Sequence, residues 1–131
     1  MKVAEKIIVI VCDDIREEVA GKISLMGIYH DLQVDKFPAV LSKLCASIML
    51  EGVKIKVNSV DFTMLFPGDQ PRTIALAPPD KSKKIANNIN LNVFIVPLQL
   101  LSEGLAKFEI IFNGDEKTKF THEFQIRLRK E

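Results

Sequence analysis

The segment from Lys117 to Arg129, KTKFTHEFQIRLR, alternates between two classes of residue along its whole length. One set, with mostly apolar side chains, consists of Phe120, His122, Phe124, Ile126 and Leu128. The intervening set is polar or charged. Since successive side chains of a β-strand point to opposite faces, this period of two predicts a strand with one buried face. The charged face also suits a sheet edge, where charges oppose unwanted pairing.

A second strand is expected immediately before it, because LAKFEIIF places Ala106, Phe108, Ile110 and Phe112 on one face. Asn113 and Gly114 lie between the two runs, and both residue types tolerate the positive φ of a tight hairpin turn. We therefore expect a β-hairpin at the C-terminal end of the sequence.

Further short apolar runs, separated by Gly and Pro, fill the rest of the chain. Strands are expected in KIIVIVC, KISLMGIY, LCASIML, residues 54–66, RTIALA and INLNVFIV, with a type II turn at Pro67-Gly68. Pro97 and Gly104 favour one helical turn between them. The pattern predicts an all-β fold, an antiparallel two-layer β-sandwich with at most one or two short helical turns. We expect residues 1–131 to form a single domain.

Composition limits the classes of partner. The 131 residues carry 18 basic and 17 acidic side chains, a net charge of +1, so no long-range field attracts nucleic acid. The apolar run from Ile7 to Cys12 is too short to span a membrane, and no signal-peptide cleavage site follows it. Cys12 and Cys45 lie in strand-like runs, which favours buried free thiols. We expect a cytoplasmic protein without membrane or nucleic-acid partners.

Three stretches of the sequence resemble those of a known protein family. VCDDIREEVAGKISLMGIY followed by FPAVLSKLCASIML, together with the closing GLAKFEIIFNGDEKTKFTHEFQI, resembles a family of small uncharacterised bacterial proteins, a domain of unknown function. The resemblance covers both ends of the chain and is weaker between residues 52 and 96. It implies an immunoglobulin-like or C2-like β-sandwich, and it implies no activity.

The acidic stretch after the first strand is the main candidate for a site. Asp13, Asp14, Glu17 and Glu18 follow one another closely, and an extended chain would turn Glu17 inward beside Ile15 and Val19. We therefore expect residues 13–20 to leave the sheet through one helical turn, with Asp14 and Glu17 at capping-box spacing. Calcium binding by these carboxylates is one hypothesis, since calcium prefers oxygen ligands. The simpler hypothesis is that the stretch is a solvated connector between strands, in which Arg16 and Lys22 neutralise the carboxylates.

The histidines offer little for catalysis. His122 shares a face with Phe120 and Phe124, which favours a core or rim position, whereas His30 is expected to be exposed. No nucleophile motif surrounds Cys12 or Cys45, and phosphate-binding glycine loops are absent. A small hydrolase using His30 or His122 is the least favoured hypothesis.

Two polar groups remain. Asn88, Asn90 and Asn92 form a row of amides that could read a sugar or a peptide backbone, although a solvated strand face explains them equally. Lys81, Lys83 and Lys84 predict a small basic loop, with phosphate binding as the alternative to simple solvation.

Together these observations favour a non-catalytic binding or assembly module with a protein partner, which could be a second copy of the chain. The apolar stretch Leu98 to Leu101 is a candidate for such an interface. The alternative is a calcium- or ligand-responsive C2-like domain that uses the acidic connector, residues 13–18. No cofactor, catalytic residue or metal ligand is assigned. The candidate interaction residues are Asp13, Asp14, Arg16, Glu17, Glu18 and His30.

Overall fold

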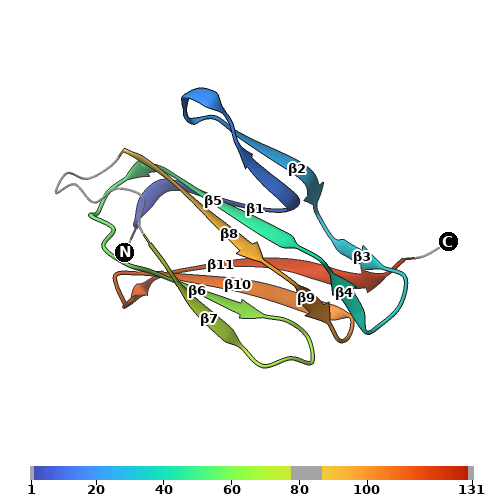
Figure 1. Cartoon of the computed structure of the whole chain (residues 1–131). Coiled ribbons are helices and arrows are strands. Elements are labelled where there is room, and N and C mark those ends of the chain that lie inside the picture. The colour runs from blue at the N-terminus through green and yellow to red at the C-terminus, as the bar shows by residue number, and fades with distance from the viewer. Residues whose placement is uncertain (1, 78–86, 130–131) are drawn as a thin grey trace.

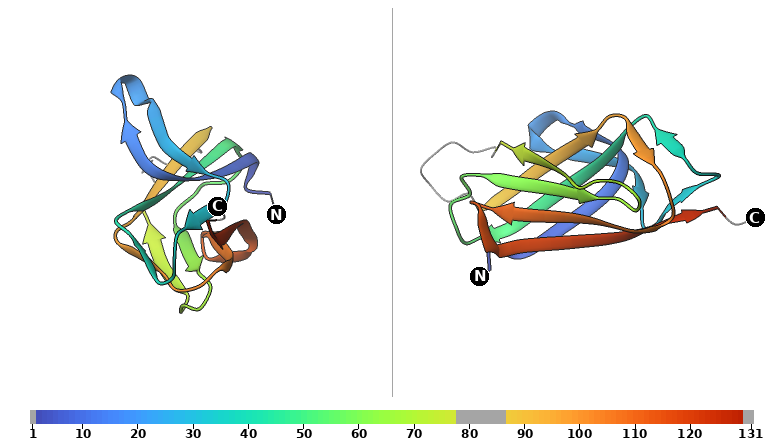
Figure 2. Two further views of the ribbon diagram at one scale, coloured as in Figure 1. Left: turned by 90° about the vertical axis from the view of Figure 1, so that its right-hand side faces the viewer. Right: turned by 90° about the horizontal axis from the view of Figure 1, so that it is seen from below.

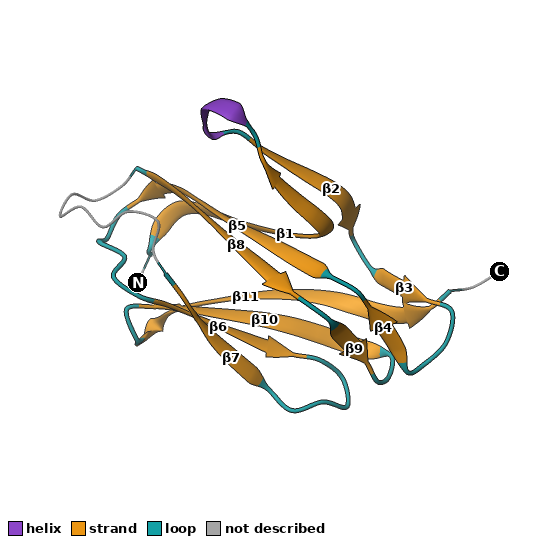
Figure 3. Cartoon of the chain, in the orientation of Figure 1, coloured by secondary structure: helices purple, strands orange, loops and turns teal. Residues whose placement is uncertain are grey.

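The computed structural model describes residues 2–77 and 87–129. Strands dominate it, and the single helical element in this part of the chain is a short 3-10 turn, η1 (Val19–Gly21) (Figure 3). The strands are β1 (Ala4–Glu17), β2 (Ile23–Tyr29), β3 (Leu32–Val34), β4 (Ala39–Leu41), β5 (Leu44–Val53), β6 (Val60–Leu65), β7 (Arg72–Leu76), β8 (Asn88–Ile95), β9 (Leu98–Leu100), β10 (Gly104–Phe112) and β11 (Asp115–Leu128). The expected all-β sandwich is confirmed.

Two sheets form the layers of the sandwich (Figures 1 and 2). One has the strand order β2-β1-β5-β8, the other has the order β3-β11-β10-β6-β7, and β4 pairs with β9 in a small third sheet. Among the described strands the pairing is antiparallel, except that β3 runs parallel to the end of β11. Among the described residues, no helix is long and apolar enough to cross a membrane.

The core lies between the inner faces of the two sheets and is rich in phenylalanine. Phe108 of β10 is fully buried, with its ring centre 4.9 Å from that of Phe62 and 5.1 Å from that of Phe124. Phe66 meets Phe108 edge to face at 6.1 Å. The opposing sheet contributes aliphatic side chains such as Ile48, which is also fully buried. Burial of this apolar surface is the main stabilising term of the fold.

The C-terminal hairpin has the predicted turn. Asn113 and Gly114 have φ values of 55° and 67°, and β10 pairs with β11 through matches such as Phe108 with His122. The expected turn at Pro67-Gly68 is also present, since Gly68 has a φ of 75° and the Asp69 amide donates to the Phe66 carbonyl at 3.1 Å.

The long strand expected over residues 54–66 is shorter, because residues 54–59 lie outside any strand. The side chain of Asn113 holds this segment instead. Its Oδ1 accepts hydrogen bonds from the amides of Asn58 (2.7 Å) and Ser59 (3.2 Å), and its Nδ2 donates to the Lys56 carbonyl at 2.8 Å. These contacts come from a turn distant in sequence, so local periodicity could not indicate them.

The helical turn expected between Pro97 and Gly104 is wrong. Leu98–Leu100 is strand β9, paired with β4 through matches such as Leu98 with Leu41. Both leucines are fully buried, while Gln99 between them is exposed. Because the core takes these side chains, Leu101, which is 39% exposed, is the part of the candidate interface Leu98 to Leu101 that still presents apolar surface. The lysines of the predicted basic loop, Lys81, Lys83 and Lys84, lie outside the described residues.

Two phenylalanines provide a test of this core. Replacing Phe108 with Ala should lower the free energy of unfolding by about 3–5 kcal/mol, because it leaves a cavity among packed rings. Phe94→Ala should cost about 1 kcal/mol or less, since that side chain is 51% exposed. Urea denaturation of both variants measures the difference, and equal losses would contradict the assignment of Phe108 to the core.

Candidate interaction surface

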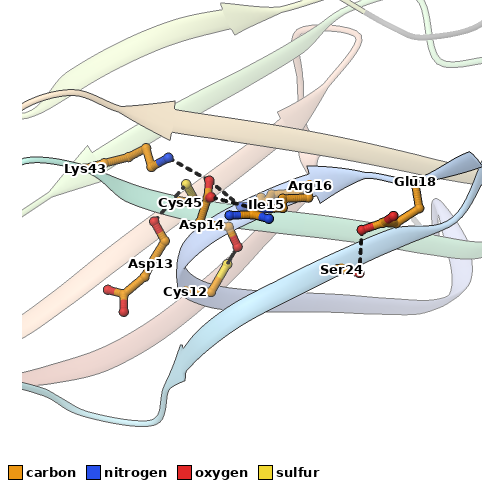
Figure 4. Close-up of polar contacts among 9 residues, drawn as sticks. All are labelled: Cys12, Asp13, Asp14, Ile15, Arg16, Glu18, Ser24, Lys43 and Cys45. Carbon is orange, nitrogen blue, oxygen red and sulfur yellow. Dashed lines mark hydrogen bonds and ion pairs between the residues drawn. The ribbon is translucent and has the colours of Figure 1, made fainter.

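The acidic stretch belongs to a hairpin that folds back over its own sheet. Strand β1 pairs with β5 up to Cys12 and then continues to Glu17 paired with β2 alone. Near Asp13 it bends sharply, so that its second half returns across the outer face of the four-stranded sheet (Figures 1 and 4). We call the hairpin of residues 13–29 the ribbon.

This geometry corrects the helical turn expected at residues 13–20. The chain does leave the plane of the sheet, but residues 13–17 remain a strand, and only Val19–Gly21 forms a 3-10 turn at the tip. Glu17 is exposed because the ribbon extends beyond the main core. Val19, which was expected to face the core, is 87% exposed.

A small second core lies beneath the ribbon. Ile15 is buried against Cys12 and Cys45, with Leu25 packed beside them. The two cysteines are cross-strand neighbours on β1 and β5, and both are free and fully buried, as the sequence predicts. Burial raises the pKa of Cys12 to about 11 and also raises that of Cys45, which keeps both thiols protonated. Their role is therefore packing at the base of the ribbon.

Asp13, Gly27 and Tyr29 fix the bend. The Tyr29 hydroxyl donates a hydrogen bond to the Asp13 carboxylate, and burial together with this carboxylate raises the pKa of Tyr29 to about 12. Gly27 stands opposite Asp13 with a φ of +67°, and a Cβ there would lie only 2.9 Å from Asp13 Cγ. Only glycine satisfies both the backbone conformation and the space that the carboxylate occupies.

Asp14 ties the bend to the neighbouring strand. Its carboxylate accepts a hydrogen bond from Lys43 Nζ at 2.6 Å and lies 3.7 Å from Arg16 Nε (Figure 4). It also accepts from the Ile15 amide at 2.9 Å. The hydrogen bond from Lys43 is the largest cause of the lowered pKa of Asp14. Lys43, just before β5, was not indicated by the sequence as a partner of the acidic stretch.

The four acids therefore do not converge. Asp13 contacts Tyr29, Asp14 contacts Lys43, and Glu18 accepts a hydrogen bond from Ser24 at 3.2 Å. In the part of the chain that the structure describes, no group of three or more His, Cys, Asp or Glu side chains could hold a metal ion. This arrangement does not favour the calcium hypothesis, because calcium needs several oxygen ligands around one point.

A shallow groove of about 280 Å³ separates the ribbon tip from the sheet beneath it. Gly21 and Ile23 line it from above, and Met49, Leu50, Glu51, Asn88, Ile89 and Asn90 line it from the sheet. The predicted asparagine row contributes to this outer face. Asn90 donates to Ser47 Oγ at 3.0 Å, and Ser47 donates to Asn92 Oδ1 at 2.9 Å, so part of its hydrogen-bonding capacity is already used.

His30 and His122 lie far apart in sequence but line one groove of about 320 Å³, between the end of β2 and strand β11. His122 is half-buried, in agreement with the predicted rim position, and His30 is exposed. Residues 9–11, 28, 29 and 123 complete the lining. Neither cysteine lines this groove, so the geometry gives no support to a cysteine-histidine nucleophile.

The ribbon also exposes apolar side chains that the sequence analysis did not single out. Met26 and Ile28 of β2 are 43% and 53% exposed. Their strand, ISLMGIY, contains no charged residue, and this lack of charge was the available signal. Of the sequence-based candidates, Asp13, Asp14 and Arg16 lie at the bend, Glu17 and Glu18 lie at the tip, and His30 lies in the separate histidine groove.

The bend predicts a specific sensitivity at Gly27. Gly27→Ala should destabilise the protein by roughly 1–2 kcal/mol from the left-handed backbone alone, with a further loss from contact with Asp13. The double variant Asp13→Ala with Gly27→Ala should regain the stability lost through contact with Asp13, but it should not regain the stability lost through the left-handed backbone. Gly114→Ala, which has similar φ but open space around it, is the matched control for thermal denaturation.

A second prediction concerns pH. Burial lowers the pKa of His122, so the folded protein binds a proton at this residue less readily than the unfolded chain. The stability that neutral His122 contributes is fully present above the unfolded pKa of about 6.5, and it is lost as the pH falls from there through the lower pKa of the folded state. Melting temperatures between pH 8 and pH 5 should therefore decline less for His122→Gln than for the wild type. An identical decline would contradict this assignment.

Comparison with known proteins shows the family to which the chain belongs. No curated protein matches the sequence. A family model matches residues 7–127, a range that includes the bend, the whole ribbon and nearly all of both sheets. The chain therefore belongs to DUF6941, a family of unknown function.

Proposed function

We propose that this protein is a non-catalytic protein-binding module, and that the ribbon is its recognition surface. The observation that carries the proposal is the exposure of Met26 and Ile28 on a strand without charged residues. Exposed apolar side chains on a projecting element are typical of sites where a partner protein covers them.

The anchoring of the ribbon supports this proposal. The hydrogen bonds from Tyr29 to Asp13 and from Lys43 to Asp14 restrain the bend on both sides, and Ile15 packs beneath it. A surface that is already held in place loses less conformational entropy on binding than a free loop. In this proposal the acids of the bend position the ribbon, and they do not themselves bind a ligand.

The tip supplies a polar rim. Glu17, Glu18 and Lys22 are exposed around the 3-10 turn, next to the exposed Val19. An apolar centre with charged residues at its border is the usual composition of a protein interface. We also propose a cytoplasmic location, which suits the free thiols of Cys12 and Cys45 because a reducing compartment preserves them.

Site-specific photocrosslinking tests the proposal. A benzophenone amino acid at position 26 should crosslink a partner protein in lysate of the source organism, and the same probe at Val40 should not. Val40 is the matched control because it is 67% exposed on β4, outside the ribbon.

The partner identified in this way should then be purified and titrated. Ile28→Lys should weaken its binding about tenfold or more, since a charge would be desolvated in the interface. Val40→Lys is the control, because Val40 is 67% exposed on β4, outside the ribbon. Equal weakening by both variants, or crosslinks of equal yield from positions 26 and 40, would refute the ribbon as the recognition surface.

A further inference from the structure

We propose that strand β8 is a self-association edge, at which the protein pairs antiparallel with the same strand of a second copy. The inference is independent of the ribbon, which lies at the other edge of the four-stranded sheet. In the resulting dimer the two four-stranded sheets would form one continuous sheet across a two-fold axis.

The first observation is the regularity of β8. It pairs with β5 through eight consecutive residue pairs, from Asn88 with Glu51 to Ile95 with Leu44, without a shift of register. It is the last strand of its sheet, so within the described residues no strand pairs with its other side. A long regular edge presents a row of backbone donors and acceptors to any strand of matching shape.

The second observation is the absence of charge. β8 has the sequence NINLNVFI, without a charged residue. By contrast, β11, which has no described partner strand on one edge before Ile126, carries exposed charged residues, including Lys117, Lys119 and Glu123. Charges at an edge oppose strand addition, and β8 lacks this protection. β2 is also uncharged, but Gly27 with its positive φ interrupts it. Of the two edges of the four-stranded sheet, β8 is therefore the one that suits a straight antiparallel addition.

The third observation is self-complementarity, which selects a second copy as the occupant. Residues Ile89, Leu91, Val93 and Ile95 face the core, and Asn88, Asn90, Asn92 and Phe94 face outward. A two-fold axis perpendicular to the sheet keeps each residue opposite one on the same face. Aliphatic side chains then meet aliphatic ones, asparagines meet residues of the outward row, and no like charges face each other.

The outward row also contains a side chain that pairing would cover. Phe94 is 51% exposed, and Val96 immediately after the strand is 65% exposed. If the axis passes through Leu91, Phe94 of one copy lies opposite Asn88 of the other. If it passes through Asn92, the same two positions are diagonal neighbours. In both registers residues 88 and 94 are within side-chain reach across the interface.

Charge placement at these two positions tests the inference. Light scattering coupled to gel filtration, from micromolar to near-millimolar protein, should show the wild type converting from monomer to dimer. Asn88→Lys with Phe94→Lys should weaken dimerisation about tenfold or more, because the new lysine at position 88 would meet the new lysine at position 94 of the other copy. Asn88→Lys with Phe94→Glu should restore association and make it sensitive to salt, because the charges now attract.

Leu105→Lys is the matched control and should dimerise like the wild type, since it adds the same charge at an exposed position on β10, in the other sheet. Hydrogen exchange of the wild type adds a measurement that needs no variant: peptides covering residues 88–95 should be protected at high concentration and less so on dilution. A wild type that stays monomeric at the highest concentration would overturn the inference. So would a lysine pair that leaves association unchanged, and neither result would affect the proposal for the ribbon.

Discussion

The bend of β1 at Asp13 is the constraint on which the outer surface of this protein depends. A strand that continued straight would carry Asp14, Arg16 and Glu17 away from the sheet into solvent. Instead, the left-handed backbone of Gly27 leaves room for the Asp13 carboxylate, and Tyr29 holds that carboxylate through its hydroxyl. One glycine opposite one acid thus decides where the whole hairpin lies.

Three further features follow from the bend. Ile15 is carried over Cys12 and Cys45 and encloses them in a second small core, which explains why two adjacent thiols on an outer face are fully buried. The ribbon tip comes to lie above Met49 and Asn90 and forms a shallow groove with them. Met26 is then left exposed, because the sheet beneath the ribbon is already occupied by Ile15 and Leu25.

The four-stranded sheet consequently has two different edges. At one edge, β2 belongs to the anchored ribbon, and Gly27 with its positive φ interrupts its regular backbone. Its main exposed feature is the pair of side chains Met26 and Ile28. At the other edge, β8 is straight and uncharged, and its free backbone groups are its main feature. Side-chain recognition at β2 and strand addition at β8 are compatible in one molecule, since the two edges are separated by β1 and β5.

The sequence by itself determined the strands whose pattern is local. The period of two in β11, the Asn113-Gly114 turn and the Pro67-Gly68 turn depend on neighbouring residues only, and all three are present in the structure. The rim position of His122 followed from the same alternation. The burial of the two thiols was predicted from the apolar runs around them, although the structure achieves it by covering them with the ribbon.

Tertiary structure alone decided the rest, because the deciding contacts join residues distant in sequence. Lys43 reaches Asp14, and Asn113 holds residues 56–59, which no local pattern indicates. Leu98 and Leu100 became a buried strand because β4 was available to pair with them. The acidic residues were singled out from the sequence, but their separate partners appeared only when the bend brought Tyr29 and Lys43 beside them.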